Sequence, residues 1–332
     1  MSKPATSRSD AAIDPDRLLA LHGTMVLIRK VEERLSQLFA DGEVPGFIHL
    51  SIGQEAIAAG VNSGLSDIDT VASTHRGHGH ALAKGVPLDR FFAEIMGRDT
   101  GLCRGRGGSM HVADTSIGML GANGIVGAGI PLAMGSALAH QTRKTGGIAV
   151  AFFGDGALAE GVLHETLNMA SLWSLPLLFV CENNGWSEFS PTDRQFRANI
   201  VELASVFGIE GRTVDGDDLV AVTAATQEIV AAIRHGGGPY VLEAKTNRVR
   251  GHYEGDAQTY RTDGDRPDAA DPIARSRAAL LAAGLTEEAV AATESEAVVA
   301  VETAVEAARA APPADVSAAR NGVYTDAVRG AA

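Results

Sequence analysis

The sequence predicts an α/β protein in which a doubly wound parallel sheet is flanked by helices. Two apolar runs, 148–153 and 177–181, have the length and unbroken hydrophobicity of strands that are buried on both faces. The segment between them carries apolar residues at helical spacing, and a right-handed strand–helix–strand crossover makes the two strands parallel. Strands and helices alternate in the same way along much of the chain, which is typical of this fold class.

Composition narrows the class of protein. The chain has 332 residues, of which 45% are hydrophobic, enough for one large α/β domain with an appendage or for two small domains. Its net charge of −13 argues against a nucleic-acid partner and against an anionic membrane surface. The two cysteines, Cys103 and Cys181, have neither a disulfide framework nor metal-site spacing. Since no signal peptide or membrane-spanning apolar run is present, we expect a cytoplasmic protein.

The N-terminal half is expected to hold a long helix at its start, two short helices, a strand and a further, alanine-rich helix. Residues 1–16 are polar and predict a disordered tail. Apolar residues recur at helical spacing over 16–40, and shorter helices are expected at 53–64 and 88–96. Residues 71–73 end a strand, and 75–79 form a loop at its carboxyl edge. A loop rich in glycine and arginine, 97–108, leads to a glycine-rich segment that continues as an alanine-rich helix over 124–140, with no strong strand before it.

The central unit and the C-terminal half follow from similar patterns. The helix expected after Asp155 carries an apolar face that consists of Val162, Leu163, Leu167, Ala170 and Trp173. Leu175-Pro176 ends this helix. Helices are expected at 200–207 and 219–234, and strands at 212–214 and 240–244. A long polar loop, 248–267, precedes helices at 271–284 and 286–311, the first capped by Asp271 and Pro272. We therefore divide the chain into a tail (1–16), an α/β domain (17–267) and a helical C-terminal extension (268–332).

The two central strands each end on a potential metal ligand. Asp155 follows the first strand within Gly154-Asp155-Gly156, and Asn184 follows the second within Asn183-Asn184. The carboxyl ends of parallel strands share one edge of the sheet, so these side chains should be neighbours. Carboxylate and amide oxygens suit a Mg²⁺ that keeps positions open for phosphate oxygens. The alternative is that both motifs are ordinary structural turns.

Basic residues gather at a second strand end. The segment 75–80 contains His75, Arg76, His78 and His80; the guanidinium can bind phosphate and the imidazoles can donate hydrogen bonds or move protons. A zinc site made of the three histidines and a solvated loop are the alternatives. His252, in the loop after the strand at 240–244, could likewise be a solvated residue.

Two further loops could contact an anionic ligand. Arg104 and Arg106 could steer an anion or could belong to a mobile surface loop. The glycines of 121–129 allow backbone groups at a helix start to face a ligand. Their spacing does not match the Gly-x-Gly-x-x-Gly pattern of NAD-binding proteins, which disfavours that alternative.

Taken together, these motifs resemble the α subunit of the thiamine diphosphate-dependent first component of 2-oxo acid dehydrogenase complexes. Four segments carry the resemblance: the 154–184 unit, residues 107–111 (Gly-Gly-Ser-Met-His), residues 123–127 and the loop that contains Arg76. The resemblance extends from about residue 18 to about residue 277. It implies a thiamine diphosphate-binding fold that holds only the diphosphate-binding domain. The local sequences at 73–80 and 251–261 look closer to acetoin dehydrogenase α subunits. Pyruvate-type members have Tyr-Arg where this chain has His75-Arg76, and regulated mammalian members carry a phosphorylated serine where it has Tyr253.

The resemblance also implies roles for individual residues. Asp155, Asn184 and the carbonyl of Trp186 would bind Mg²⁺. His75, Arg76, Gly156, Ala157 and His252 would surround the diphosphate, and Gly124 and Val126 would offer backbone groups to the aminopyrimidine. His78 and His252 would face the reacting thiazolium carbon and assist proton transfer.

The implied enzyme cleaves acetoin or a 2-oxo acid such as pyruvate and transfers the acyl unit to a lipoyl group. The carboxylate that activates the cofactor would come from a β subunit carrying the pyrimidine-binding domain, in an α2β2 heterotetramer, and the lipoyl group from an acyltransferase. We therefore expect the isolated chain to be inactive. The alternatives are an acyloin-forming or acyl-transferring enzyme of specialised metabolism without a lipoyl partner, and a non-enzymatic subunit that retains the fold.

Overall fold

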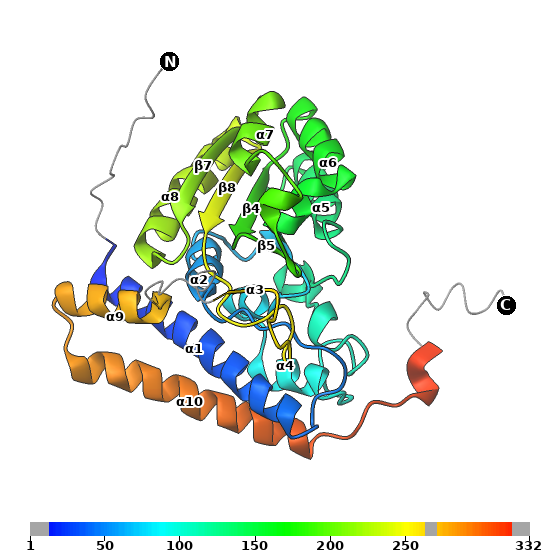
Figure 1. Ribbon diagram of the computed structural model, residues 1–332, viewed down its shortest axis with the longest axis vertical. Coiled ribbons are helices and arrows are strands. Elements are labelled where there is room, and N and C mark those ends of the chain that lie inside the picture. Colours follow the sequence, from blue (N-terminus) through cyan, green and yellow to red (C-terminus); the bar gives the residue numbers. More distant parts are fainter. Residues whose placement is uncertain (1–12, 263–270, 321–332) are drawn as a thin grey trace.

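A six-stranded parallel sheet forms the centre of the molecule (Figure 1). The computed structural model describes residues 13–262 and 271–320. The strands lie in the order β2 (Met119–Gly121), β1 (Thr70–Ala72), β3 (Ala149–Gly154), β4 (Leu177–Asn183), β8 (Tyr240–Lys245) and β7 (Glu210–Asp215), and every neighbouring pair is parallel. The predicted α/β class with a doubly wound parallel sheet is confirmed.

Helices cover both faces of the sheet, which explains why its central strands are apolar throughout. Along β3, Phe152 packs into one core and Phe153 into the other, because successive strand side chains point to opposite faces. The core that contains Phe153 lies under α5 (Gly129–Arg143), α6 (Gly161–Leu172) and α7 (Ile200–Val206). The core that contains Phe152 lies under α2 (Glu55–Asn62), α3 (His78–Ala83) and α8 (Leu219–Ala232).

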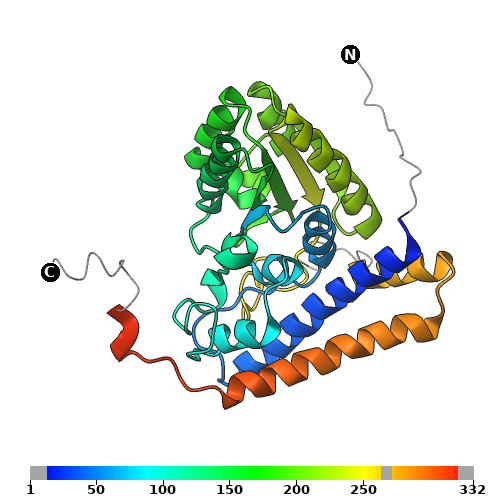
Figure 2. The same ribbon diagram turned by 180° about the vertical axis from the view of Figure 1, so that it is seen from behind.

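The terminal helices pack beside the sheet. α10 (Glu287–Ala310) lies along α1 (Pro15–Ala40) and α4 (Leu88–Ile95), as Figures 1 and 2 show from opposite sides. Val301 and Val305 of α10 are buried in the same core as the sheet residue Val150. α9 (Pro272–Ala282) begins with the predicted cap, in which the Asp271 carboxylate accepts from the Ile273 N–H at 3.0 Å.

The proposed division of the chain stays a prediction, because the boundary at 267–268 and most of the 1–16 tail lie outside the described residues. The part of that tail that is described already enters α1 at Pro15. Of the 248–267 loop, residues 248–262 are described and contain no helix or strand. None of the helices in the described ranges is long and apolar enough to cross a membrane.

Short elements complete the architecture. β5 (Trp186–Ser187) and β6 (Ser190–Pro191) form an antiparallel pair after β4. Single-turn helices occur at Ser109–His111, Thr115–Ile117, Asp155–Ala159, Thr192–Arg194, Ile233–Gly237 and Ser317–Arg320.

Two local predictions are wrong. The loop at 75–79 is shorter than expected, because His78 already opens α3. Trp173 lies beyond the end of α6 and is 45% exposed, so it does not extend the apolar face of that helix. The glycine-rich segment is preceded only by the short strand β2, whose three residues agree with the expectation that no strong strand lies there and are too few to produce a period-2 pattern in the sequence.

Candidate active site

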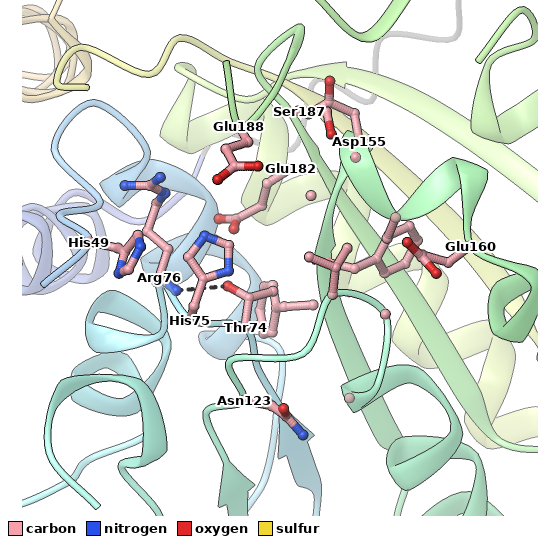
Figure 3. A pocket seen from close by; sticks show the side chains of 18 of the residues that line it. His49, Thr74, His75, Arg76, Asn123, Asp155, Glu160, Glu182, Ser187 and Glu188 are labelled. Atoms are coloured by element: carbon pink, nitrogen blue, oxygen red, sulfur yellow. Dashed lines mark hydrogen bonds between the residues drawn. The ribbon is translucent and has the colours of Figure 1, made fainter. Parts of the chain in front are cut away.

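A cavity of about 420 Å³ opens at the carboxyl edge of β1, β3 and β4. In a doubly wound sheet this edge is where ligands bind, because loops from both directions of winding meet there. Figure 3 shows its two sides: His49, His75 and Arg76 gather on one, and Asp155 and Glu160 on the other. All but one of the predicted site residues line this cavity, namely His75, Arg76, Gly124, Val126, Asp155, Gly156, Ala157, Asn184, Trp186 and His252. The exception is His78.

The two expected metal ligands are neighbours, as the strand–helix–strand unit requires. The backbone N–H of Asn184 donates to Oδ1 of Asp155 at 3.3 Å, and the Thr192 hydroxyl donates to Oδ2. The Asn184 side chain is oriented by a bond from its Nδ2 to Gln54 at 3.1 Å, which leaves its oxygen beside the Trp186 N–H, also at 3.1 Å.

The Asp155 carboxylate is buried without a direct ion-pair partner. It is 1% exposed and forms no salt bridge with another described residue, and burial raises its pKa from 3.8 to about 6. A buried carboxylate is stabilised by a cation, so the donor set fits the divalent metal that the sequence predicts. The glycine after it is also required. A Cβ on Gly156 would lie 2.7 Å from Oγ and 3.1 Å from Cβ of Ser187, so a larger residue here would have to displace Ser187.

Two arginines supply positive charge to the cavity. Arg76 donates to the carbonyls of Leu50 and His252, the latter at 3.0 Å, and burial lowers its pKa to about 10. Arg248 donates to the Glu188 carbonyl and the Tyr260 hydroxyl, both at 3.0 Å, while its Nε is buried without a partner. Guanidinium groups placed in this way can hold a phosphate-bearing ligand.

Three imidazoles meet next to these arginines. His49, His75 and His252 contact one another, with ring centroids 4.7, 5.0 and 5.4 Å apart. Burial lowers the pKa of His49 to about 3 and that of His252 to about 4, and neighbouring Arg76 contributes in both cases. The pKa of His75 is lowered well below its ordinary value for the same reasons. These rings are therefore neutral at pH 7 and can both donate and accept hydrogen bonds.

The expectation that His78 faces the reacting centre is wrong on the geometry. Its ring is fully buried, with Nδ1 2.9 Å from Oε2 of Glu32 and Nε2 2.7 Å from Oγ of Ser109. Because α3 begins two residues earlier than a loop at 75–79 would allow, the side chain turns toward α1 instead of the cavity. The imidazole that lies beside His252 is that of His49.

His80, the third member of the predicted zinc alternative, is also engaged elsewhere. Its ring bonds Ser73 at 2.7 Å and Glu182 at 3.1 Å and stacks on Phe152. A zinc site made of the histidines of the 75–80 segment is therefore excluded.

The arginine-rich loop at 97–108 does not contribute a side chain to the cavity. The buried Glu94 carboxylate accepts hydrogen bonds from four backbone N–H groups of this loop, those of Cys103, Gly105, Gly107 and Gly108. Neither Arg104 nor Arg106 lines the cavity. The loop instead leads into the segment 109–111, of which Met110 does line it.

Several cavity residues were not singled out from the sequence. His49 and Gln54 belong to a His-Leu-Ser-Ile-Gly-Gln-Glu string before α2 whose polar residues interrupt an otherwise apolar stretch, a signal that could have been used. Arg248 is the first basic residue of the loop that contains His252. Ser187 carried no sequence signal, because it matters only through its closeness to Gly156.

Comparison with known proteins agrees with this site. Residues 23–317 match the family model described as dehydrogenase E1 component. The α subunit of the acetoin:2,6-dichlorophenolindophenol oxidoreductase of Bacillus subtilis is 48% identical over 78% of this chain and 78% of its own length. The protein of the same name from Cupriavidus necator is 45% identical over 92% and 94%. The α subunit of the pyruvate dehydrogenase E1 component of Zymomonas mobilis is 40% identical over 91% and 87%.

Proposed function

Because the chain belongs to the dehydrogenase E1 component family, we propose that it is the α subunit of a thiamine diphosphate-dependent dehydrogenase that cleaves acetoin or a 2-oxo acid. The observation that carries the proposal is a single cavity in which buried oxygen ligands face a pair of guanidinium groups. A ligand that carries both a divalent metal and an anionic phosphate group satisfies both sides at once. A buried carboxylate alone or an arginine pair alone would fit many other ligands.

Particular residues would hold the cofactor. Asp155, Asn184 and the Trp186 carbonyl would hold Mg²⁺, whereas Arg76, Arg248 and the backbone at Gly156 and Ala157 would hold the diphosphate. Thiamine diphosphate, when bound, supplies the electron sink that allows a carbon–carbon bond next to a carbonyl to break. The residues of this chain supply position and charge.

The proton-transfer role assigned from the sequence to His78 and His252 moves to His49 and His252. Both rings line the cavity and are neutral at neutral pH, so one nitrogen can donate a hydrogen bond to a substrate oxygen while the other accepts. His78 instead keeps the segment 109–111 in place through Ser109.

A partner subunit is part of the proposal. Apolar side chains that line or adjoin the cavity are uncovered in this chain: Ile125 (72% exposed) and Val126 (48%) line it, and Phe189 (43%) packs against the cavity residue His252. Apolar side chains gathered at the rim of a site are typical of a surface that another subunit covers. We propose a β subunit in an α2β2 assembly, which would add the carboxylate for the aminopyrimidine, and a lipoyl acyltransferase as acceptor of the acyl unit.

The experiment is a comparison of the chain alone, a β subunit alone and the co-expressed pair. Acetoin, pyruvate and branched 2-oxo acids would be offered with 2,6-dichlorophenolindophenol as the electron acceptor, with and without thiamine diphosphate and Mg²⁺. We expect dye reduction only by the pair and only with both cofactors. Turnover by the chain alone would contradict the shared site, and cofactor-independent turnover would contradict the function. Replacing the dye by a lipoyl domain tests the acyl acceptor separately.

A further inference from the structure

Gln54 is a buried residue of the cavity to which the proposed function gives no role. It is 3% exposed and lies directly before α2, where its N–H closes a turn onto the Ser51 carbonyl at 2.9 Å. Its side-chain oxygen Oε1 accepts from Nδ2 of Asn184 at 3.1 Å. The bond joins segments that are 130 residues apart in the sequence, and it ends on one of the residues proposed to hold Mg²⁺.

The orientation of the Asn184 amide follows from its two neighbours. The backbone N–H of Trp186 can only donate, so the Asn184 atom that lies 3.1 Å from it is the oxygen. The NH₂ group then faces Gln54 and needs an acceptor, which Oε1 supplies. Oδ1 of Asn184 keeps a second lone pair for the metal ion that it would share with Asp155.

A buried ion pair fixes the turn that carries Gln54. The carboxylate of Glu55, which is fully buried, accepts from the Gly53 N–H at 3.0 Å and from Nε of Arg29 at 2.6 Å. Arg29, on α1, also donates two hydrogen bonds, at 2.9 and 3.0 Å, to Asp271, the cap of α9. The side chain of Gln54 therefore extends from a backbone position that both terminal helices hold.

We propose that Gln54 is a positioning residue for the metal ion, because its oxygen holds the Asn184 amide with the oxygen toward the metal and the nitrogen away from it. An amide needs such a residue, since only one of its two terminal atoms can coordinate a metal. Its terminal torsion is broad and roughly two-fold, so hydrogen bonds decide which atom faces the ion. The inference rests on the proposed function, which places Mg²⁺ at Asn184.

The test uses the enzyme assembled with its β subunit and Mn²⁺ as a paramagnetic substitute for Mg²⁺. Electron paramagnetic resonance at saturating thiamine diphosphate gives the number of bound Mn²⁺ ions and their dissociation constant. Gln54→Met keeps the length of the side chain but removes the acceptor. We expect it to weaken Mn²⁺ binding about 10–100-fold, the usual effect of losing a group that orients a metal ligand. The exposed Gln37 provides the matched control, because Gln37→Met should bind Mn²⁺ as the wild type does.

Asn184→Asp separates orientation from a general loss of structure. A carboxylate offers an oxygen at either end, so it needs no residue to orient it. In the Asn184→Asp background, Gln54→Met should therefore change the Mn²⁺ affinity by less than about threefold, and the double-mutant cycle measures the coupling between the two side chains.

Gln54→Glu is a second variant in case Gln54→Met does not fold or assemble, which thermal unfolding establishes. It keeps an acceptor oxygen, so its Mn²⁺ affinity should not fall below that of the wild type. A wild type that binds no Mn²⁺ with thiamine diphosphate would overturn the proposed function and this inference together. If the wild type binds Mn²⁺, three results would overturn the role of Gln54 alone: unchanged affinity in Gln54→Met, the same loss in both backgrounds, or weaker binding in Gln54→Glu.

Discussion

Replacing Asp155 by asparagine should make the metal-free chain more stable while it removes the metal site. The carboxylate is buried without a direct ion-pair partner, and burial raises its pKa from 3.8 to about 6. That difference corresponds to ~3 kcal/mol, at about 1.36 kcal/mol for each tenfold change in proton affinity. Because the folded-state pKa is the higher one, the contribution of this carboxyl is fully present below pH 3.8. It is lost as the pH rises to about 6.

Asparagine keeps the shape and both hydrogen bonds of the site. Its amide oxygen can accept from the Asn184 N–H and its NH₂ group can donate to the Thr192 hydroxyl. Above pH 6 the variant should therefore be more stable than the wild type by up to ~3 kcal/mol. With 332 residues and about 2.1 cal/mol/K of unfolding entropy for each, this is a rise in melting temperature of ~4 °C.

The assay is thermal unfolding of both chains in a metal chelator between pH 4 and pH 8, repeated with Mg²⁺ and thiamine diphosphate. We expect the difference between the two melting temperatures to grow between pH 4 and pH 6 and to stay constant above pH 6. The added ligands should raise the melting temperature of the wild type only. Equal melting temperatures at pH 7, or a variant less stable than the wild type, would refute the claim that the carboxylate is buried without compensation. Stabilisation of the variant by the ligands would refute its role in metal binding.

Three further predictions concern single side chains. His252→Gln should lower kcat of the assembled enzyme by roughly 10²–10⁴-fold, the range of a general acid or base, with cofactor affinity changed far less; a loss confined to cofactor binding would contradict the catalytic role. His78→Asn should lower the free energy of unfolding in denaturant by about 1–3 kcal/mol, because the buried Glu32 carboxylate loses its imidazole partner and keeps only the two hydrogen bonds from Ser51; an unchanged free energy of unfolding would contradict a stabilising contact. Gly156→Ala should lower the free energy of unfolding by about 1–3 kcal/mol, because the new Cβ would lie 2.7 Å from Oγ of Ser187. Denaturant unfolding of the double variant Gly156→Ala/Ser187→Gly checks the cause: the second substitution should restore the stability if the clash is responsible.

The sequence was sufficient where local pattern decides the structure. β3 and β4 were predicted because both faces of each strand are covered, so hydrophobicity runs unbroken from Ala149 to Phe153 and from Leu177 to Cys181. Asp155 and Asn184 could be placed together because parallel strands end at one edge. The strand β2 was missed because three residues cannot establish a period.

The sequence was insufficient where long-range contacts decide it. Nothing near His78 in the chain indicates that its partner is Glu32, which is 46 residues away on α1. The helix start at His78 then turns the ring inward. His49 approaches His252 only after α2 and the loop that follows β8 have packed together. An imidazole in a basic motif therefore has no predictable direction until the tertiary contacts are known.

The cavity depends on Arg76 for more than its charge. This side chain comes from the loop after β1 and donates to the carbonyls of Leu50 and His252, so it joins the segment before α2 to the loop after β8. Those two segments carry His49 and His252, and the pKa of each is lowered in part by the same guanidinium. One buried arginine thus joins the two segments that carry the imidazoles and adds to the burial that keeps the rings neutral. Since its positive charge is desolvated, an anion in the cavity would stabilise it directly, and binding of a phosphate-bearing ligand would consolidate the arrangement of both histidines.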